Sequence, residues 1–338
     1  MNRRVHRTKK AGSLDNLKLI TEELSDPYDN EVTIEVKAVG LNFADVFALV
    51  GLYSATPKGS FIPGLEFSGN VIKLGKNVTK FKVGDRIMGV TRFGGYVTHL
   101  NISTDYIYYL PNQWTFPEGA AFITQALTAY YALIPLGNLQ NKNTVLIHSA
   151  AGGVGIYANR IAKKYNTYTI GSIGTPDKIQ TLNQEGYDDY IVRDKYFFEN
   201  LQKKLNGRDL NLVLECIGGK IFEDSFRSLS PAGRIVVYGS ANFAPESKSP
   251  NLLKLAYKYV NRPKIDPLSM ISSNKSLLAF NLIWLWDKIE ELSQMLEIIL
   301  QMNLSPPLIG KTFPFENALD ALNYFKSGKS VGKVILET

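Results

Sequence analysis

The chain has 338 residues, of which 45% are hydrophobic and 20% charged, the composition of a soluble globular protein with room for about two domains. A single cysteine, Cys216, excludes an internal disulfide framework and a four-cysteine zinc lobe, and the absence of a secretory signal or membrane-length apolar run predicts a cytoplasmic protein. The net charge of +7 suits an anionic cofactor, nucleic acid or acidic lipid, and alone selects none of them.

The first third of the chain is predicted to be rich in β-structure. In "EVTIEVKAV", residues 31–39, Val32, Ile34 and Val36 alternate with polar residues, which is the period of a half-buried strand. Turn signals such as "IPG", "KVGD" and "FGG" follow at short intervals. Residues 117–134, "PEGAAFITQALTAYYALI", are then predicted to form one helix.

From about residue 143 short apolar runs alternate with helical stretches. The runs are "NTVLIHS", "NTYTIGSI", "DDYIV", "NLVLECIGG" and "GRIVVYGS". This alternation predicts βαβ units and a parallel sheet. Two amphipathic helices, at residues 289–299 and 315–325, follow, and "VGKVILE" closes the chain as a strand.

The closing strand has no partner nearby in the sequence, so we expect it to return to the β-rich part. The predicted architecture is therefore α/β, with an α/β domain inserted into a β-rich one. The β-rich domain comprises residues 1–121 and 290–338, and the inserted domain comprises residues 122–289.

One glycine-rich stretch, "HSAAGGVGIYANRIAKK" at residues 148–164, lies where a predicted strand becomes a helix. It is a relative of G-x-G-x-x-G in which a small residue replaces the first glycine. Small residues allow a tight turn, let main chain approach a diphosphate and pack helix against strand, while the helix N-terminus attracts the anion. The alternative is a glycine-rich turn that binds nothing. The residues expected at the diphosphate are Ser149, Gly152, Gly153, Val154 and Gly155.

The next strand predicts which dinucleotide is bound. A site for NAD normally ends this strand in Asp or Glu, which holds the ribose 2′-hydroxyl. Here the strand ends in Gly171 and Ser172, and the cations Lys178 and Arg193 follow. A missing carboxylate with nearby cations favours a 2′-phosphate and hence NADPH, with Asp177 expected to point away. The alternative for both cations is solvated surface charge.

Several motifs together carry a family resemblance. "GLNFADV", "PGLEFSGNV", "VGDRIMG", "FGGYVTH", "LTAYYAL", "HSAAGGVG", "VVYGSAN" and "VGKVIL" resemble the medium-chain dehydrogenase/reductase superfamily, in its zinc-free quinone oxidoreductase branch. "GLNFADVFALVGLY" and "YGSANFAP" are similar to the vesicle amine transport protein group. The resemblance implies a GroES-like catalytic domain, a Rossmann domain, NADPH between them, and a homodimer joined near the strand before "YGSAN".

The resemblance also implies that no metal is bound. Zinc-dependent relatives place cysteine where Asn42 stands and histidine where Leu65 stands, just before Glu66. A zinc site needs three or four ligands, whereas the three histidines of this chain are scattered along the sequence.

Further site residues follow from the likeness. Asn42 is expected to face the nicotinamide, Asp45 to brace that loop, and Tyr53 to line the substrate pocket. Relatives commonly carry tyrosine where Arg193 stands, which places the cofactor preference in question. For each residue the alternative is a local turn, cap or packing role. The remaining positions expected near the nicotinamide are Thr128, Gly239 and Ser240.

The resulting hypothesis is an enzyme that transfers hydride from NADPH to a quinone or α,β-unsaturated carbonyl. Alcohol oxidation is disfavoured without zinc to polarise the oxygen, whereas a quinone is already activated. Tyr53 or water is the expected proton source.

A second hypothesis is a membrane- or lipid-associated protein that keeps the reductase scaffold. In residues 248–264 apolar side chains alternate with lysine and arginine, the pattern of a basic amphipathic helix on an anionic bilayer. The other interpretation is a helix that covers the cleft or a dimer surface. Nucleic acid is a weaker alternative, because no recognised module carries the charge.

Overall fold

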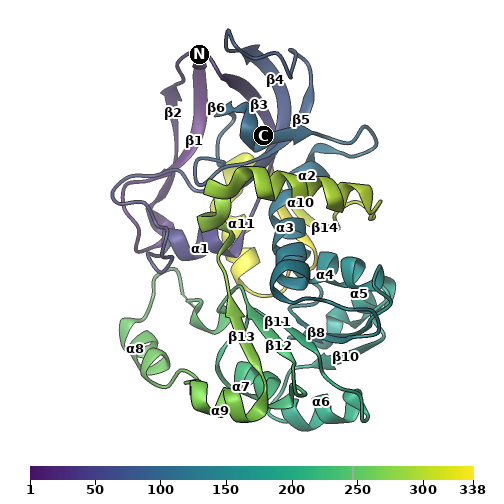
Figure 1. Ribbon diagram of the computed structural model, residues 1–338. Coiled ribbons are helices and arrows are strands. Elements are labelled where there is room, and N and C mark those ends of the chain that lie inside the picture. The colour runs from purple at the N-terminus through teal and green to yellow at the C-terminus, as the bar shows by residue number, and fades with distance from the viewer. Residues whose placement is uncertain (246) are drawn as a thin grey trace.

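Two lobes, each built around one large β-sheet, make up the computed structural model, which describes residues 1–245 and 247–338 (Figure 1). The first lobe holds a seven-stranded sheet in the order β14-β15-β3-β4-β5-β7, with β6 paired to β3, and a ribbon of β1 and β2. The strands are β1 (Asn2–Thr8), β2 (Leu17–Glu23), β3 (Glu31–Gly40), β4 (Glu66–Leu74), β5 (Arg86–Val90), β6 (His99–Ser103), β7 (Ile107–Tyr109), β14 (Ile309–Pro314) and β15 (Lys333–Glu337).

The last strand confirms the predicted return of the chain to the first lobe. β15 pairs antiparallel with β3 and parallel with β14. The alternation in residues 31–39 is also confirmed, because β3 buries Val32, Ile34 and Val36. The C-terminal segment therefore brings its preceding loop to the boundary between the lobes.

The second lobe is a six-stranded parallel sheet in the order β10-β9-β8-β11-β12-β13. The strand order reverses between β8 and β11, and in such sheets ligands bind in the crevice at the carboxyl ends of the strands at this point. The parallel sheet is thus confirmed. Its strands are β8 (Thr144–His148), β9 (Tyr168–Ile173), β10 (Asp189–Val192), β11 (Leu212–Glu215), β12 (Arg234–Val237) and β13 (Ser276–Ala279).

Helices cover both faces of the parallel sheet and fill the space between the lobes (Figure 1). The two predicted C-terminal helices are confirmed as α10 and α11. The helices are α1 (Phe43–Leu49), α2 (Phe116–Gly119), α3 (Ile123–Tyr131), α4 (Gly153–Lys163), α5 (Ile179–Gln184), α6 (Phe197–Leu205), α7 (Gly219–Ser228), α8 (Leu252–Val260), α9 (Pro267–Ser273), α10 (Ile289–Gln301) and α11 (Ala318–Lys326).

The single helix predicted over residues 117–134 is wrong in its continuity. The structure divides it into α2 and α3, and a π-helical turn at Ala132–Leu136 follows. At the break, Gly119 lies so close to the first lobe that a Cβ would come within 2.5 Å of Leu110 Cδ1. The stretch Phe116–Leu136 is apolar and long enough to cross a membrane by length and composition, but 72% of its most apolar window is buried inside the fold.

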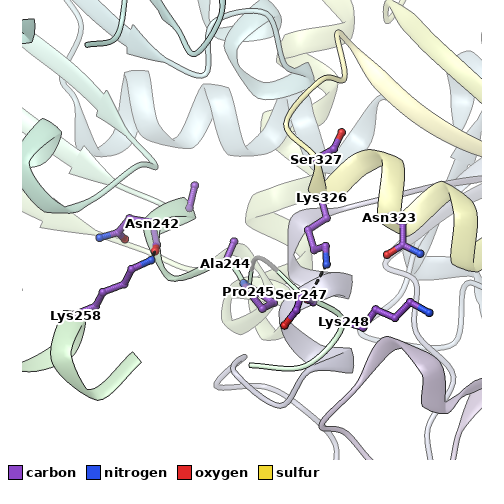
Figure 2. A pocket seen from close by; sticks show the side chains of 10 residues that line it. Asn242, Ala244, Pro245, Ser247, Lys248, Lys258, Asn323, Lys326 and Ser327 are labelled. Atoms are coloured by element: carbon purple, nitrogen blue, oxygen red, sulfur yellow. Dashed lines mark hydrogen bonds between the residues drawn. The ribbon is translucent and has the colours of Figure 1, made fainter. Parts of the chain in front are cut away.

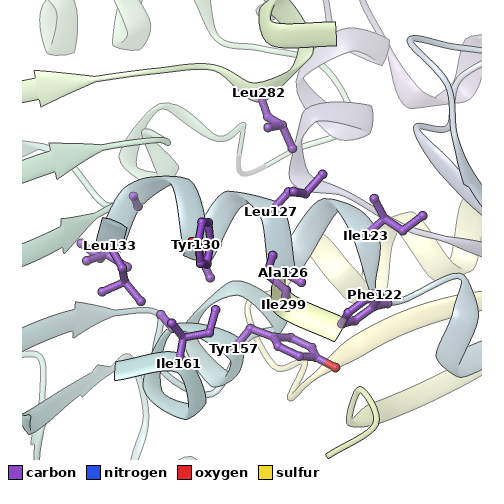
Figure 3. Packing of buried hydrophobic residues seen from close by; sticks show 14 of the residues in the cluster. Phe122, Ile123, Ala126, Leu127, Tyr130, Leu133, Tyr157, Ile161, Leu282 and Ile299 are labelled. Carbon is purple, nitrogen blue, oxygen red and sulfur yellow. The ribbon is translucent and has the colours of Figure 1, made fainter. Parts of the chain in front are cut away.

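The main hydrophobic cluster runs from the first lobe through α3 and α4 to α10 (Figure 3). Phe122 belongs to this cluster and is 2% exposed. The Phe122 ring meets the edges of Trp114 at 4.8 Å and Tyr157 at 5.4 Å between centroids. Because this core is continuous across both lobes, the domain boundaries at residues 121 and 289 stay predictions.

The sequence analysis missed strand β13, and this changes where an edge of the sheet lies. The strand before "YGSAN" is β12, which is covered by β13 and is therefore not an edge strand, and the expected homodimer near it stays a prediction. β13 is short and only half-buried, with Leu277 37% exposed, so no long apolar run marks it. The edge strand on this side is β13.

Truncating the Phe122 ring in the shared core should destabilise the whole protein. We expect Phe122→Ala to lower the free energy of unfolding by about 3–5 kcal/mol, because it removes a buried ring and leaves a cavity. Chemical denaturation measures this, with Leu253→Ala as the control because Leu253 is 85% exposed. Equal effects of the two substitutions would contradict the account of the core.

Candidate functional site

The glycine-rich corner lies where β8 passes into α4. Ser149 adopts a left-handed conformation with φ of 51°, and the Gly152 amide closes the turn on Ser149 O at 2.8 Å. The first helical hydrogen bond runs from the Ile156 amide to Gly152 O, so the amides of residues 153–155 have no acceptor inside the helix. With the positive end of the helix dipole, they form a site suited to an anion.

The glycines of the corner are required by close contacts. A Cβ at Gly155 would lie 2.6 Å from Ser149 O, and one at Gly153 would lie 2.8 Å from Gln125 Oε1. A Cβ at Gly152 would meet only Ser149 O, at 3.2 Å, so its outer side is open. The corner therefore presents bare main chain, as a bound diphosphate needs.

The corner also touches the first lobe. The Gly332 amide donates to Ala151 O at 2.7 Å, and Gly152 and Gly332 pair as a parallel β-bridge. Lys178, on the turn Pro176–Lys178, donates to Gly328 O at 2.5 Å and Ser330 O at 2.8 Å. The loop before β15 thus closes against the corner, which lies at the boundary between the two lobes.

Lys178 and Arg193 are the two cations predicted at the far ribose. The Arg193 guanidinium donates to Ser172 O at 3.0 Å and Ser172 Oγ at 3.1 Å. Burial and the nearby Arg193 charge lower the pKa of Lys178, although Asp177 opposes them. Asp177 itself is exposed, as expected. Arg193 thus contacts the end of β9, whereas the Lys178 ammonium bonds to the loop before β15, and the predicted role of both cations at the 2′-phosphate stays a prediction.

A chain of hydrogen bonds between buried side chains of β8 and β9 holds Arg193 in place. His148 Nδ1 lies 3.0 Å from Ser172 Oγ, and His148 Nε2 lies 2.9 Å from Ser225 Oγ. Burial holds the pKa of His148 well below its usual value, so the ring is neutral. Because Ser172 Oγ accepts from Arg193, its own proton goes to Nδ1, and Nε2 donates to Ser225. His148 is structural in this arrangement.

Glu215 is a buried carboxyl at the end of β11, 3.2 Å from His148 Nε2. Its Oε1 accepts the Ile217 and Gly218 amides, the latter at 2.6 Å, whereas its Oε2 lacks a hydrogen bond among the described residues. Burial raises the pKa of Glu215 to about 7 against the effect of those amides and of Arg193. This group was not predicted, although an acid in the apolar run "NLVLEC" is unusual.

A cavity of about 710 Å³ opens between the lobes, beside the loop that covers the corner (Figure 2). It lies between the turn Ala241–Phe243 and α8 of the second lobe and the end of α11 of the first. Three of its ten described lining residues are lysines and none is an acid, so the cavity suits an anion. The lining residues are Ala241, Asn242, Ala244, Pro245, Ser247, Lys248, Lys258, Asn323, Lys326 and Ser327.

Asn42 belongs to a buried polar cluster, and its side chain is fully used there. Its Oδ1 accepts from Lys333 Nζ and from Gln125 Nε2, both at 2.8 Å. Its Nδ2 donates to Glu66 Oε1 at 2.9 Å and to Gly40 O at 3.3 Å. The amide thus points into the first lobe, and its predicted role at the nicotinamide stays a prediction.

Asp45 braces the start of α1. Asp45 Oδ2 accepts the Asn42 amide at 2.8 Å and the Tyr96 hydroxyl at 3.2 Å, and Oδ1 accepts the Gly64 amide at 3.2 Å. Burial raises the pKa of Asp45 to about 7, although these donors and the Lys333 charge lower it. The expected bracing of this loop has a definite structural basis.

Tyr53 joins the two lobes through its hydroxyl. Its hydroxyl donates to Asn281 Oδ1 at 2.8 Å, across the boundary between the lobes. Burial raises the pKa of Tyr53 to about 12. A second link between the lobes is the exposed ion pair of Arg92 and Asp287. The Tyr53–Asn281 hydrogen bond therefore depends on how the two lobes are positioned relative to each other.

The remaining predicted positions lie on α3 and after β12, and their predicted place near the nicotinamide stays a prediction. Thr128, on α3, is 8% exposed. Gly239 follows β12 and packs so closely on Cys216 that a Cβ would lie 3.0 Å from Cys216 Cβ. Ser240 Oγ donates to Asn242 Oδ1 at 3.0 Å, at the rim of the cavity.

The cavity, the partner of Tyr53 and most of the buried cluster were not predicted from the sequence. Lys333, like Glu215, carries a sequence signal, because it is a charged residue inside the apolar strand "VGKVILE". The others depend on contacts across the boundary, which no local pattern records. Over residues 1–245 and 247–338, no three His, Cys, Asp or Glu side chains form a group that could hold a metal.

Comparison with known proteins agrees with this geometry. Residues 28–112 match an alcohol dehydrogenase GroES-like domain, and residues 186–336 match a zinc-binding dehydrogenase domain. These matches confirm the predicted GroES-like and Rossmann pair. The synaptic vesicle membrane protein VAT-1 homolog of Homo sapiens is 31% identical over 331 residues, 96% of this chain and 84% of that protein.

Two further proteins extend the comparison. The quinone oxidoreductase of Sus scrofa is 28% identical over 313 residues, 92% of this chain and 90% of that protein. A mycobacterial structure complexed with NADPH superposes with a TM-score of 0.85 at 22% identity, over 99% of this chain and 100% of that one. At that identity the structural match shows the fold alone.

The buried Glu215 carboxyl should make stability fall as pH rises. The fold raises its pKa from 4.5 to about 7, so between those values the folded state keeps a proton that the unfolded state loses. Relative to Glu215→Gln, the wild type should lose about 3 kcal/mol of unfolding free energy from pH 4.5 to pH 8. Denaturation at pH 5 and pH 8 measures this, with exposed Glu199→Gln as the control. Parallel pH profiles of wild type and Glu215→Gln would contradict the account.

Proposed function

We propose that this chain, which belongs to the medium-chain dehydrogenase/reductase family in the branch of quinone oxidoreductases and VAT-1 homologues, transfers hydride from NADPH to a quinone or α,β-unsaturated carbonyl. The observation that carries the proposal is the bare glycine corner at the boundary between the lobes, with Arg193 at the end of β9 and Lys178 on the turn that follows it. The mycobacterial structure of the same fold holds NADPH.

The residues present fit a dinucleotide with a 2′-phosphate. The amides of residues 153–155 would hold the diphosphate, and Lys178 and Arg193 would hold the 2′-phosphate. Lys178 spends two of its three N–H donors on Gly328 O and Ser330 O, which leaves one for a phosphate oxygen. A carboxylate in this position would repel the phosphate, and the strand has none.

The proposed nicotinamide end of the site would orient an acceptor and exclude water. When bound, NADPH supplies the hydride. Gly239 and Thr128 would face the nicotinamide end of NADPH, where both residues are small. Tyr53 Oη holds a proton at neutral pH, because burial raises its pKa to about 12, and it is the candidate donor to the reduced acceptor once its bond to Asn281 opens.

Cofactor binding tests the phosphate cations. We expect wild-type protein to bind NADPH at least about tenfold more tightly than NADH, because a charge-assisted hydrogen bond contributes about 1.5–3 kcal/mol. Lys178→Met and Arg193→Met should each remove most of that preference while changing NADH binding little. Quenching of protein fluorescence measures both constants.

Turnover tests the acceptor. Loss of nicotinamide absorbance is followed with a panel of quinones and enones, and we expect oxidation of NADPH with at least one of them. For the binding measurements, Lys311→Met, at an exposed lysine, is the matched control for Lys178→Met and Arg193→Met. Equal binding of NADH and NADPH would sink the phosphate assignment, and tight NADPH binding without turnover on any acceptor would sink the proposed reaction.

A second candidate, binding to an anionic membrane, is favoured by one specific surface. Helix α8 buries no residue and exposes apolar side chains beside Lys254 and Lys258. Figure 1 shows α8 and α9 at the side of the second lobe, away from the first-lobe sheet. The most exposed apolar residues there are Leu252 (72%), Leu253 (85%), Tyr257 (70%), Leu268 (71%) and Ile271 (72%). The human relative is named as a vesicle membrane protein.

Co-sedimentation with vesicles tests this candidate. We expect the protein to pellet with phosphatidylserine vesicles and much less with phosphatidylcholine, with binding lost as salt rises. Leu253→Ser with Tyr257→Ser should abolish it, whereas Val83→Ser, exposed on the first lobe, should not. Absence of salt-sensitive binding would remove this candidate. A homodimer and a cytoplasmic location remain part of the proposal.

A further inference from the structure

Lys333 places a fully buried positive charge beside Glu66. The two side chains are 4% and 1% exposed, and Nζ lies 2.5 Å from Glu66 Oε1. Glu66 Oε2 accepts the Thr124 amide at 3.2 Å. Burial lowers the pKa of Lys333, while the Glu66 charge raises it. A buried ion pair of this kind is costly to break, because one partner is then left charged and uncompensated.

The pair lies directly beside the glycine corner, on two sides. Lys333 follows Gly332, whose amide bonds to Ala151 O at the corner. On the other side, Gln125 donates to Asn42 Oδ1 in the cluster, while its side chain packs against Gly153. One glutamine side chain therefore separates the Lys333 cluster from the amides that would hold a diphosphate.

This position creates an electrostatic problem that the cluster has to solve. A diphosphate carries two negative charges, and an uncompensated Glu66 carboxylate in the low-dielectric interior next to it would repel it strongly. Lys333 cancels that charge within hydrogen-bond distance. The cluster as a whole is then compatible with an anion on the other side of Gln125.

We propose that Lys333 is the charge-compensating residue of the cofactor site: it neutralises the buried carboxylate of Glu66 so that an anionic dinucleotide can bind at the adjacent corner. This inference rests on the proposed NADPH site. It assigns Lys333 to affinity for the diphosphate, and it gives the ion pair a task beyond linking β15 to β4 across β3.

The two single variants separate this role from a purely structural one by the sign of their effects. If the pair only cross-links strands, Lys333→Met and Glu66→Gln should both weaken NADPH binding. If Lys333 compensates charge, Lys333→Met should weaken it at least about tenfold, whereas Glu66→Gln should leave it unchanged or tighten it. Lys333→Arg should keep the wild-type affinity within about threefold, because it keeps the charge.

Fluorescence titration with NADPH measures each dissociation constant, and thermal melting checks that each variant is folded. The double variant Lys333→Met with Glu66→Gln removes both charges, so it should fold and recover binding to within about threefold of the wild type. If Lys333→Met alone does not fold, the affinity of this double variant for NADPH still decides the test. Lys311→Met, on the neighbouring strand β14, is the matched control.

Failure of this inference is distinguishable from failure of the proposed function. If the wild type binds no NADPH, the proposed function fails and this inference fails with it. If the wild type binds NADPH but both single variants weaken it, or the folded double variant binds as weakly as Lys333→Met, only the compensating role is overturned.

Discussion

The position of the proposed cofactor site depends on one main-chain contact between the lobes, where Gly152 meets Gly332. The Gly332 amide reaches Ala151 O at 2.7 Å, and a Cβ at Gly332 would come within 2.2 Å of Leu308 O. No larger residue fits there without moving the backbone. The first lobe thus meets the second at the turn that precedes the amides of residues 153–155, which have no acceptor inside the helix. These are the amides proposed to hold the diphosphate of the cofactor.

The cations at the two ends of the boundary are held in different ways. Near the corner, Lys333 offsets Glu66, and at the far sugar Arg193 is held by Ser172 and the neutral His148. The cavity between the lobes adds further lysines from both lobes. The buried acids Asp45 and Glu215 have raised pKa values, and Glu66 is paired with Lys333, so these three acids add little negative charge to the boundary where the proposed anion would bind.

The sequence predicted what depends on local pattern and missed what depends on distant contacts. The glycine corner and the alternating strand at residues 31–39 follow from small residues and short-range periodicity, and the return of the last strand follows from its lack of a partner nearby in the sequence. The fold comparisons bear out the architecture. β13 escaped notice because it is short and half-exposed. The bond between Tyr53 and Asn281 joins residues 228 positions apart, so it could not be predicted locally.

Hydrogen–deuterium exchange with and without NADPH tests the central claim most directly, because it reports on the corner amides themselves. The account predicts that exchange slows in peptides covering residues 149–157 and 328–334 and stays constant in the strand His99–Ser103. Protection elsewhere in the chain with no change at residues 149–157 would contradict it.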